Sequence, residues 1–513
     1  MSHKEPLLTN KDFTLFARLA IAAVIAIVCA AAKMSGSTKL ILCIAAIIIA
    51  AFELLTRVAK NILKFNFLNE QFLILIALIV TLIAGKYPEA VLAAMLYRVS
   101  EFLSQKLRRH ALDMAESAGC YPDTDKRSRM DAFVTKTLHY YVPAVILIAL
   151  LVAFIPMIFV EDIIPWLTRA AIILMVGSPC AITFSIPLCS LFAIYRMSHE
   201  GLALNSAAAT DMLAAVNTVV FDNTEALSAS KYILSDILPV PGLSSRNLLM
   251  LAAYAAASAG HPSADILSSA SGENIDFDHI TGKEQIAGLG VLAHVKGLVI
   301  SAGNLAMMDK LGMRTAAEAL SSDSNALHVA LNGSYAGCIV INRMTNESAK
   351  RAIESLSNIG ISRIVLLSSA STKSTARTAK SLGITEYFSE CSSEEKAKQL
   401  EKLIAETFPE ESLCYMGSES ALLEAADIGI AEGESVPGCD AVLTTDDIGS
   451  LADAVVTAKR GRSIIIQGLV LAIVLKIALL ILTIIGIAPF WAAILADTGV
   501  AILTVANAMR AGR

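Results

Sequence analysis

The most regular pattern along the chain is a set of long apolar segments, most of them near the amino end and two near the carboxyl end. A helix needs about 20 predominantly apolar residues to cross the hydrocarbon core of a bilayer. Eight segments approach or exceed this length, and we expect each to form a membrane-spanning helix. They lie near residues 14–33, 38–57, 69–85, 87–104, 137–160, 164–195, 463–486 and 488–509.

The region between the sixth and seventh apolar segments, residues 200–460, has a different pattern. Short apolar runs alternate there with amphipathic stretches, which is typical of a parallel sheet covered by helices. A long insertion, from about Ser228 to Asn342, separates the first apolar run from the others. We expect strands at Thr218–Phe221, Arg363–Leu367, Ser412–Met416 and Ala441–Thr444, and helices at Ser348–Asn358 and Thr375–Leu382.

Composition supports a membrane protein with a soluble part, because 55% of the residues are hydrophobic and only 17% are charged. The formal net charge of −5 argues against a nucleic-acid partner. The nine cysteines lack paired spacing, so we expect them to be reduced. Basic residues follow the second, fourth and sixth segments and precede the seventh, and such residues concentrate on the cytosolic side. We therefore expect an integral cell-membrane protein in the lipid bilayer, with both termini and the soluble domains in the cytosol.

The sixth apolar segment contains a helix-breaking motif, Ser178-Pro179-Cys180. Proline removes a backbone donor, and the carbonyl groups that it frees at membrane depth must be satisfied by protein or by a cavity. A thiol beside such a break can present a soft ligand to a transition-metal ion. The motif alone leaves a second interpretation open, a simple proline kink beside a structural cysteine.

Two ionisable side chains lie within the last two apolar segments, Lys476 in the seventh and Asp497 in the eighth. Charged groups at membrane depth are costly and usually mark an ion pathway or a pair. One interpretation is therefore an ion pathway that contains both residues. A structural ion pair that joins the two helices is the alternative, and the two interpretations are compatible.

Asp222 ends the first apolar run of the soluble region and is followed by Thr224. Open α/β sheets place their functional groups at the carboxyl ends of strands, so the Asp222 carboxylate is a candidate nucleophile. A membrane Pro-Cys break followed by a strand and Asp-x-Thr resembles the P-type ATPases. The resemblance is to their transition-metal branch, which exports zinc, cadmium and lead among other ions.

This resemblance implies a fold for the whole chain. It comprises a multi-span α-helical membrane domain of about eight helices and a cytosolic α/β domain of the haloacid-dehalogenase-like, Rossmann-like type. An α+β nucleotide-binding-like domain is inserted into the latter. The implied parts are spans one to four (1–110), a short cytosolic bridge (111–135), spans five and six (136–199), the phosphorylation-like domain (200–227 and 343–460), the nucleotide-binding-like domain (228–342), and spans seven and eight (461–513).

The resemblance also implies which residues form the sites. A divalent transition-metal ion such as Zn²⁺, as substrate, would be handled by Ser178, Cys180, Lys476 and Asp497, with Glu101 of the fourth span helping its release. ATP would lie against the insertion, whose matching elements are His261, Pro262, Gly288, Gly290, Gly303 and Asn304. The catalytic residues carried over are Asp222, Thr224 and Lys396, of which Lys396 would face the phosphate.

Several parts of the family's hydrolytic machinery differ in this chain. The family's Asp-Lys-Thr-Gly-Thr reads Asp222-Asn223-Thr224-Glu225-Ala226, and its Thr-Gly-Asp loop reads Ser368-Ser369-Ala370. Its magnesium hinge, Gly-Asp-Gly-x-Asn-Asp, reads Gly417-Ser418-Glu419-Ser420. Proteins hold Mg²⁺ through one or two carboxylates together with phosphate oxygens. The loss of the hinge carboxylates therefore argues against Mg²⁺ binding.

The family's actuator domain, which lies between the fourth and fifth spans, has no counterpart here. The polar bridge Gln105 to Lys136 is shorter than the roughly 40 residues below which a chain rarely sustains a core. We therefore expect a degenerate member, a pseudo-ATPase with remnants of the metal site and nucleotide domain, which pairs with a complete P-type ATPase. The alternative is an active minimal heavy-metal exporter whose actuator function is supplied in trans by a separate actuator-like protein. A phosphatase head on an inert anchor is disfavoured, because it too would need the lost carboxylates.

Overall fold

The computed structural model describes residues 10–512 apart from 64–69, 121, 124–128, 223–226, 273–274, 322–325, 346, 446 and 488. The chain divides into two compact units, and each is described by itself. Unit 1 comprises Met1–Ala215 and Asp453–Arg513, and unit 2 comprises Val216–Ala452. Unit 2 lies within the soluble region expected from the sequence, residues 200–460, whose first 16 and last 8 residues belong to unit 1.

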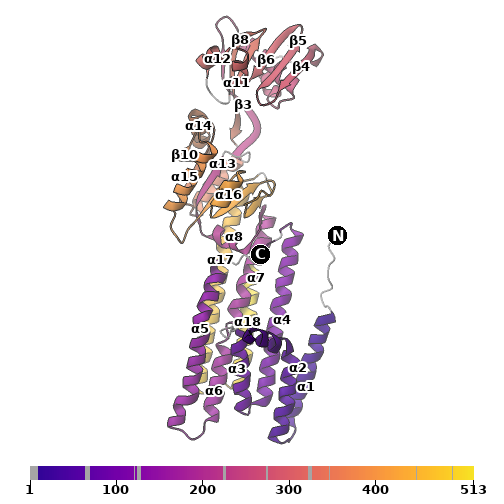
Figure 1. Ribbon diagram of the computed structural model, residues 1–513, viewed down its shortest axis with the longest axis vertical. Coiled ribbons are helices and arrows are strands. Elements are labelled where there is room, and N and C mark those ends of the chain that lie inside the picture. The colour runs from indigo at the N-terminus through magenta and orange to yellow at the C-terminus, as the bar shows by residue number, and fades with distance from the viewer. Residues whose placement is uncertain are drawn as a thin grey trace. The chain divides into compact units, whose positions relative to one another are not determined.

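Unit 1 is a bundle of long helices (Figure 1). Six of its helices are long and apolar enough to cross a membrane by length and composition, among the residues that the structure describes. The third expected span is a shorter apolar helix, and the fourth carries many charged residues. The helices are α1 (Asn10–Ala31), α2 (Gly36–Leu63), α3 (Glu70–Ile83), α4 (Tyr87–Ser117), α5 (Arg129–Phe154), α6 (Ile164–Val176), α7 (Cys180–His199), α17 (Gly449–Ile485) and α18 (Phe490–Ala508).

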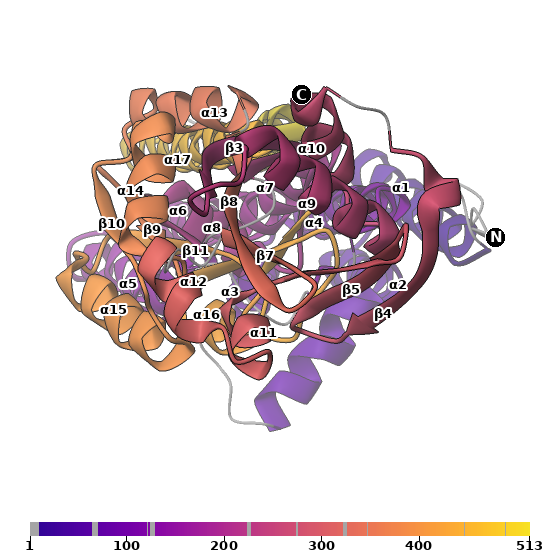
Figure 2. The same cartoon turned by 90° about the horizontal axis from the view of Figure 1, so that it is seen from above.

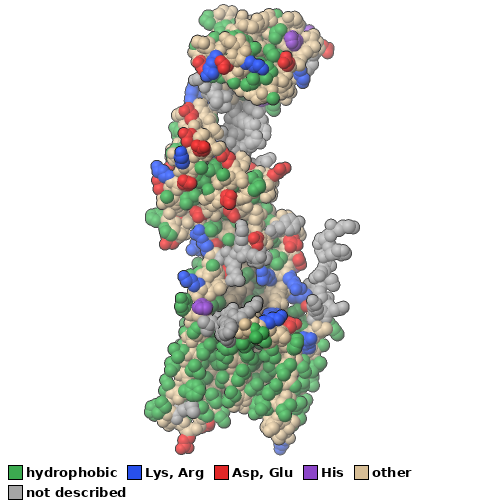
Figure 3. Space-filling view, viewed as in Figure 1, with side chains coloured by type: hydrophobic (Ala, Val, Ile, Leu, Met, Phe, Trp, Pro, Cys, Tyr) green, Lys and Arg blue, Asp and Glu red, His purple; other side chains and the backbone are tan. Residues whose placement is uncertain are grey.

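Small side chains allow the helices of unit 1 to approach closely. Helix α2 packs on α1 and α4, α6 packs on α3 and α5, and α7 packs on α4 and α18. Fully buried alanines lie along these contacts, among them Ala46, Ala77, Ala90 and Ala94. Lipid tails are as apolar as leucine, so membrane helices associate mainly through such close packing. Outward-facing side chains form a broad apolar band on the surface of the bundle (Figure 3).

The helix break that the proline motif predicts is present. Helix α6 ends at Val176, and α7 begins at Cys180 with Pro179 as its N-cap residue. Between them, Gly177 lies against α5. A Cβ atom at this position would be 2.5 Å from Cγ1 of Val145 and 2.8 Å from the carbonyl oxygen of Ile173, so a larger residue would push α5 away.

The bridge between α4 and α5 is short and is tied to the segment that follows α7. Helix α4 extends to Ser117 and α5 begins at Arg129, so both helices reach into the expected bridge at 111–135. The Asp123 amide donates to the Asn205 carbonyl at 2.7 Å, and the Met130 amide donates to the Asp211 carboxylate at 2.9 Å. Strand β1 (Leu202–Leu204) and helix α8 (Ala207–Ala214) belong to this segment, and short 3-10 turns lie at Ile155–Ile158 and Met509–Gly512.

Unit 2 contains a parallel sheet with the strand order β13-β12-β11-β2-β9-β10. Two helices cover the apolar face of this sheet, which includes Val220. They pack on it through Leu400, Leu403, Leu422 and Leu423. The strands are β2 (Val216–Asp222), β9 (Arg363–Leu367), β10 (Glu386–Phe388), β11 (Ser412–Met416), β12 (Ile428–Glu432) and β13 (Ala441–Leu443). The helices are α13 (Glu347–Asn358), α14 (Thr372–Leu382), α15 (Ser393–Glu406) and α16 (Ser420–Ala425).

The insertion forms a second, antiparallel sheet with the order β3-β8-β7-β6-β5-β4. Helix α9 covers one face of this sheet and has α10 beside it (Figure 2). The strands are β3 (Ser228–Pro239), β4 (Ile280–Ile286), β5 (Gly290–Val295), β6 (Leu298–Gly303), β7 (Ala326–Leu331) and β8 (Ser334–Thr345). The helices are α9 (Ser245–Ala259), α10 (Ala264–Ser271), α11 (Leu305–Lys310) and α12 (Arg314–Leu320), with a 3-10 turn at Phe277–His279. The expected fold class, apolar helices with an α/β domain and an α+β insertion, is confirmed.

Candidate functional site

Asp222 lies at the carboxyl end of a central strand of the parallel sheet, as its sequence position predicts. Strand β2 runs between β11 and β9, and Asp222 is in register with Leu367 at the end of β9. The residue is 7% exposed. A carboxylate with so little contact with water needs partners that satisfy its oxygen atoms.

Lys396 provides the first partner. Its helix α15 begins with a capping box, in which Ser392 and Glu395 satisfy each other's backbone amides, and this places Lys396 in the first turn. The Nζ atom lies 2.8 and 2.9 Å from the two Asp222 oxygens and 2.7 Å from Oε1 of Glu419. Burial lowers the pKa of Lys396, but the hydrogen bonds to Asp222 and Glu419 outweigh this effect and raise it above its ordinary value.

Tyr415 provides the second partner. Its hydroxyl donates to Oδ2 of Asp222 at 2.9 Å from a fully buried side chain on β11. Burial raises the pKa of Tyr415, and the charge of Asp222 raises it further, so the phenol stays a donor. Gly417 makes room for this contact, because a Cβ atom there would lie 2.6 Å from the Tyr415 hydroxyl.

These contacts decide what the end of the sheet can do chemically. Both oxygens of Asp222 accept from Lys396, and one also accepts from Tyr415, so a nucleophilic attack would require these donors to withdraw. The residues present do not fit Mg²⁺, because an ammonium group already contacts both oxygens of Asp222 and one of Glu419. Thr224 lies outside the described residues, and so do Asn223, Glu225 and Ala226.

The predicted nucleotide-contacting residues surround one cavity in the insertion. The cavity has a volume of about 580 Å³, within the range of small-molecule sites. Five of the six predicted residues line it, and they are His261, Gly288, Gly290, Gly303 and Asn304. Pro262 follows His261 but is not part of the lining.

Two glycines facing each other across neighbouring strands open this cavity. Gly290 of β5 is in register with Gly303 of β6. A Cβ atom on Gly290 would lie 2.6 Å from the Cα atom of Gly303, and one on Gly303 would lie 3.0 Å from that of Gly290. Larger residues would therefore push the strands apart. Asn304 caps helix α11 through the Met307 amide and donates to the Gly288 carbonyl at 2.9 Å, which fixes the turn at the rim.

Lys476 satisfies the break between α6 and α7. Its ammonium group donates to the carbonyl oxygens of Val176 at 2.8 Å and Ser178 at 2.7 Å, and it forms an ion pair with Asp497. A helix end leaves carbonyl groups without intrahelical partners, and in a bilayer no water replaces them. One lysine therefore caps the broken helix and also joins α17 to α18.

Four of the residues predicted for the metal site lie at the break between α6 and α7. They are Ser178, Cys180, Lys476 and Asp497. Ser178 and Asp497 line a small cavity of about 40 Å³ together with Ser100 and Thr498. Cys180 begins α7, but its side chain lies outside the described part of the chain. Over the residues described, no group of three or more His, Cys, Asp and Glu side chains forms a ready metal cage.

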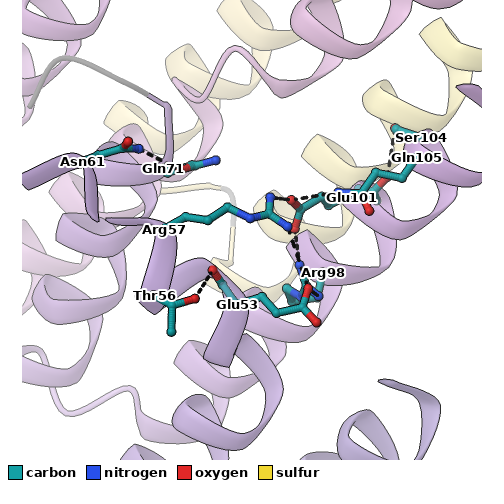
Figure 4. A network of polar contacts seen from close by, with 10 residues as sticks. Glu53, Thr56, Arg57, Asn61, Gln71, Arg98, Glu101, Ser104 and Gln105 are labelled. Carbon is teal, nitrogen blue, oxygen red and sulfur yellow. Dashed lines mark hydrogen bonds and ion pairs between the residues drawn. The ribbon is translucent and has the colours of Figure 1, made fainter. Parts of the chain in front are cut away.

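Glu101 lies in a separate charged network between α2 and α4 (Figure 4). Its carboxylate forms ion pairs with Arg57 and Arg98, and Arg98 also pairs with Glu53. The structure thus does not bring Glu101 to the Lys476–Asp497 pair. An ion that used Glu101 would first have to displace a guanidinium group.

Sequence reasoning missed several partners at these sites. Tyr415 stands in a strand whose residues are all buried, and periodicity cannot identify one functional side chain there. Arg98 and Glu53 lie at the ends of apolar segments, where they resemble ordinary interfacial charges. One signal in the sequence could have indicated this network. Helices α2 and α4 each carry an arginine and a glutamate about one turn apart.

Comparison with curated proteins finds metal-transporting ATPases. A cadmium, zinc and cobalt-transporting ATPase of Bacillus subtilis is 35% identical over 415 residues, which are 78% of this chain and 58% of that protein. A zinc-transporting ATPase of Synechocystis is 30% identical over 442 residues, which are 84% of this chain and 60% of that protein. The chain thus spans about 60% of the length of these curated relatives. No protein-family model matches it.

Comparison with solved structures finds the same kind of protein. The crystal structure of a zinc-transporting PIB-type ATPase has a TM-score of 0.74, covers 99% of this chain and 100% of that one, and is 20% identical. A crystal structure of such a protein in a second state has a TM-score of 0.72 at 21% identity, and it covers 100% of both chains. At these identities the likeness is one of fold.

Proposed function

Because the chain belongs to the transition-metal family of P-type ATPases, we propose that it is an integral membrane protein that binds a heavy-metal ion but has an impaired ATP-hydrolysing site. The names of these relatives point to zinc and cadmium as ions to test. In this proposal the soluble domains and both termini face the cytosol, in line with the basic residues that flank the apolar segments.

One observation carries the proposal of impaired hydrolysis, the contacts of Asp222. Phosphoryl transfer depends on a positioned nucleophile and on magnesium that neutralises the developing charge. Here Lys396 contacts both oxygens of Asp222, and Tyr415 donates to one of them. The positions that carry acidic groups in the family's loop and hinge are Ala370 and Ser418 in this chain. Asp222 is therefore a structural carboxylate, and Lys396 holds it in place of a divalent ion.

A remnant metal site in the membrane is the second part of the proposal. Ser178 and Asp497 share one small cavity, and Cys180 follows Ser178 by two positions. A metal ion bound there would displace the Lys476 ammonium group from Asp497. The ammonium group could still hold the carbonyl groups of Val176 and Ser178, so that the helix break would remain satisfied.

An active minimal exporter is the second candidate function. The observation that favours it is the cavity of about 580 Å³ in the insertion, which retains five of the nucleotide-contacting residues. In this case a separate actuator-like protein would supply the step that the short bridge between α4 and α5 cannot. A complete P-type ATPase that binds this chain as an accessory subunit fits the first candidate instead.

Trapping of the phosphorylated protein separates the two candidates. The purified 513-residue chain in lipid vesicles is incubated with labelled ATP, Mg²⁺ and Zn²⁺ or Cd²⁺, and acid-stable label is measured. We expect no label above that of Asp222→Asn. Label that requires both Asp222 and the metal ion would overturn the proposal and support the exporter.

Two binding measurements test the proposed nucleotide site and the proposed metal site. Nucleotide affinity of His261→Ala is compared with that of His294→Ala, because His261 lines the cavity and His294 points to solvent on β5. Only the first variant should weaken binding.

The content of bound Zn²⁺ is compared between the unmodified chain, Cys180→Ala and Asp497→Ala, and we expect both variants to lose metal. Unchanged metal content in both would refute the membrane site.

A further inference from the structure

A second cavity in unit 1 lies beside the charged network of Figure 4. Its volume is about 370 Å³, and its lining comes from α2, α3, α4 and α7. Arg57 and Glu101 of the network form part of the wall, and Arg108 of α4 forms another part. Of the residues expected at the metal site only Glu101 lines this space, and none of the residues expected to contact the nucleotide does.

The charges around the cavity leave a positive excess. Within the network, two arginines face two glutamates: Glu101 pairs with Arg57 and Arg98, and Arg98 pairs with Glu53. Arg108 adds a further positive charge, is exposed, and forms no ion pair with a described residue. The wall of the cavity is therefore more favourable for an anion than for a metal ion.

The remaining polar groups of the wall are amides and hydroxyl groups, which can donate as well as accept hydrogen bonds. Asn61 donates an amide hydrogen to the carbonyl of Gln71 at 3.1 Å, which orients the Gln71 amide nitrogen away from that bond. The guanidinium of Arg57 is part-exposed and has five N–H groups, of which the ion pairs use only some. Two guanidinium groups and an amide around one space match the oxygen atoms of a phosphate group.

The position of the cavity indicates where such a phosphate group would come from. On α2 and α4 the apolar residues give way to charged ones at Glu53 to Arg57 and at Arg98 to Glu101, so the cavity lies where the apolar part of the bundle ends. Basic side chains gather above the apolar band of unit 1 (Figure 3). Basic pockets between membrane helices at this depth are suited to anionic headgroups.

We propose that this cavity binds the phosphate group of an anionic phospholipid, with Arg57 and Arg108 as its ligands. This site requires neither the Lys476–Asp497 pair nor Asp222, so it goes beyond the proposed function. Bound lipid would contact α2, α3, α4 and α7 at the same time.

The chain offers a matched pair of variants for the test. Arg108 and Arg109 are neighbouring, exposed and equally charged, but only Arg108 lines the cavity. The full chain is exchanged into nanodiscs or vesicles of phosphatidylglycerol or of phosphatidylcholine, and retained lipid is counted by native mass spectrometry. A parallel titration uses inorganic phosphate as the probe. Arg57→Gln is made together with Glu101→Gln, so that no carboxylate is left unpaired.

We expect phosphatidylglycerol to be retained in preference to phosphatidylcholine. Arg108→Gln should weaken this retention roughly fivefold, the effect of one basic residue near an anionic surface, and Arg109→Gln should change it much less. The double variant should weaken it at least as much as Arg108→Gln. Phosphate binding that depends on Arg108 without any preference for the anionic lipid would show that a soluble anion is the occupant, and would overturn the lipid assignment. Equal effects of the two single variants, or none, would overturn the site.

Discussion

Two buried lysines in this protein each hold an aspartate, and their surroundings differ. Lys476 lies in the helix bundle, where it contacts Asp497 and two backbone carbonyl groups. Lys396 lies at the end of the parallel sheet, where it contacts Asp222 and Glu419. The first group has one positive and one negative charge, whereas the second has one positive and two negative charges.

The difference shows what each lysine replaces. In the bundle, Lys476 donates to the carbonyl groups of Val176 and Ser178, which water does not reach at membrane depth. In unit 2, water can reach part of the Glu419 side chain. There, Lys396 occupies the position between the carboxylates that a divalent ion would need. In the function proposed above, Lys476 would preserve a helix break that a metal ion could use, whereas Lys396 would close a catalytic site. Four measurements test this contrast.

The largest effect is expected for Lys476→Met. This change leaves the Asp497 carboxylate and the carbonyl groups of Val176 and Ser178 without their donor, and removal of one partner of a buried ion pair costs about 3–5 kcal/mol. The free energy of unfolding in detergent micelles measures the loss. Lys60→Met, at an exposed position of α2, is the control and should be near neutral. Lys476→Met/Asp497→Asn should recover part of the loss, and a loss as small as that of Lys60→Met would contradict the role of Lys476.

A smaller effect is expected for Lys396→Met. Water can partly replace the ammonium group at Glu419, so we expect the charged hydrogen bonds to cost about 2–3 kcal/mol in total. Hydrogen exchange of the amides in β2 and α15 measures the local loss of stability. Lys398→Met lies on the exposed side of the same helix and should leave protection unchanged. Protection in β2 that stays the same in both variants would show that Asp222 does not depend on Lys396.

Tyr415→Phe should have a milder effect still. It removes one hydrogen bond to Asp222 and keeps the ring, so about 1.5 kcal/mol is expected from the loss of a bond to a charged acceptor. Chemical unfolding followed by fluorescence measures it. Tyr387→Phe, on the part-exposed strand β10, is the control. A gain of phosphorylation at Asp222 in Tyr415→Phe would indicate that the hydroxyl suppresses the chemistry rather than supports the fold.

The fourth prediction has the least effect at neutral pH and is the most specific. We expect unit 2 to lose stability at alkaline pH. The pKa of Lys396 is raised above its ordinary value of 10.5, and that of Tyr415 is raised above 10.0. A folded-state pKa above the unfolded value contributes stability that is complete below the unfolded value and is lost as the pH rises through the folded one. The free energy of unfolding should therefore be flat from neutral pH to about 10 and fall above it. Lys396→Met/Tyr415→Phe should have a shallower fall, and a fall of equal slope would place its origin elsewhere.

Much of the fold follows from patterns that are local in the sequence. The break at Ser178-Pro179-Cys180 follows from one proline, and the strands Arg363–Leu367 and Ser412–Met416 have the bounds that their apolar runs predict. Asp222 could be placed because the carboxyl end of a parallel strand is where functional groups gather. These features need no knowledge of distant residues.

The second sheet and the charged network could not be predicted in the same way. Strand β4 has no buried residue, so its sequence lacks the alternation that marks a strand with one face in a core. Tyr415 is one of five buried residues in β11, and only the position of Asp222 on the neighbouring strand makes it special. The pairing of Arg98 with Glu53 depends on how α2 packs against α4, which no local pattern contains.

The short link between α4 and α5 has a mechanical consequence. The Asp123 amide is bonded to Asn205, and the Met130 amide is bonded to Asp211, so both sides of the link are fastened to the stretch that follows α7. A turn of α4 or α5 about its own axis would have to break these bonds or carry α7 with it. These hydrogen bonds therefore couple α4, α5 and α7, which a large intervening domain could move separately. A motion of α7 at the Ser178-Pro179-Cys180 break would be transmitted to α4 and α5 or would break the two bonds.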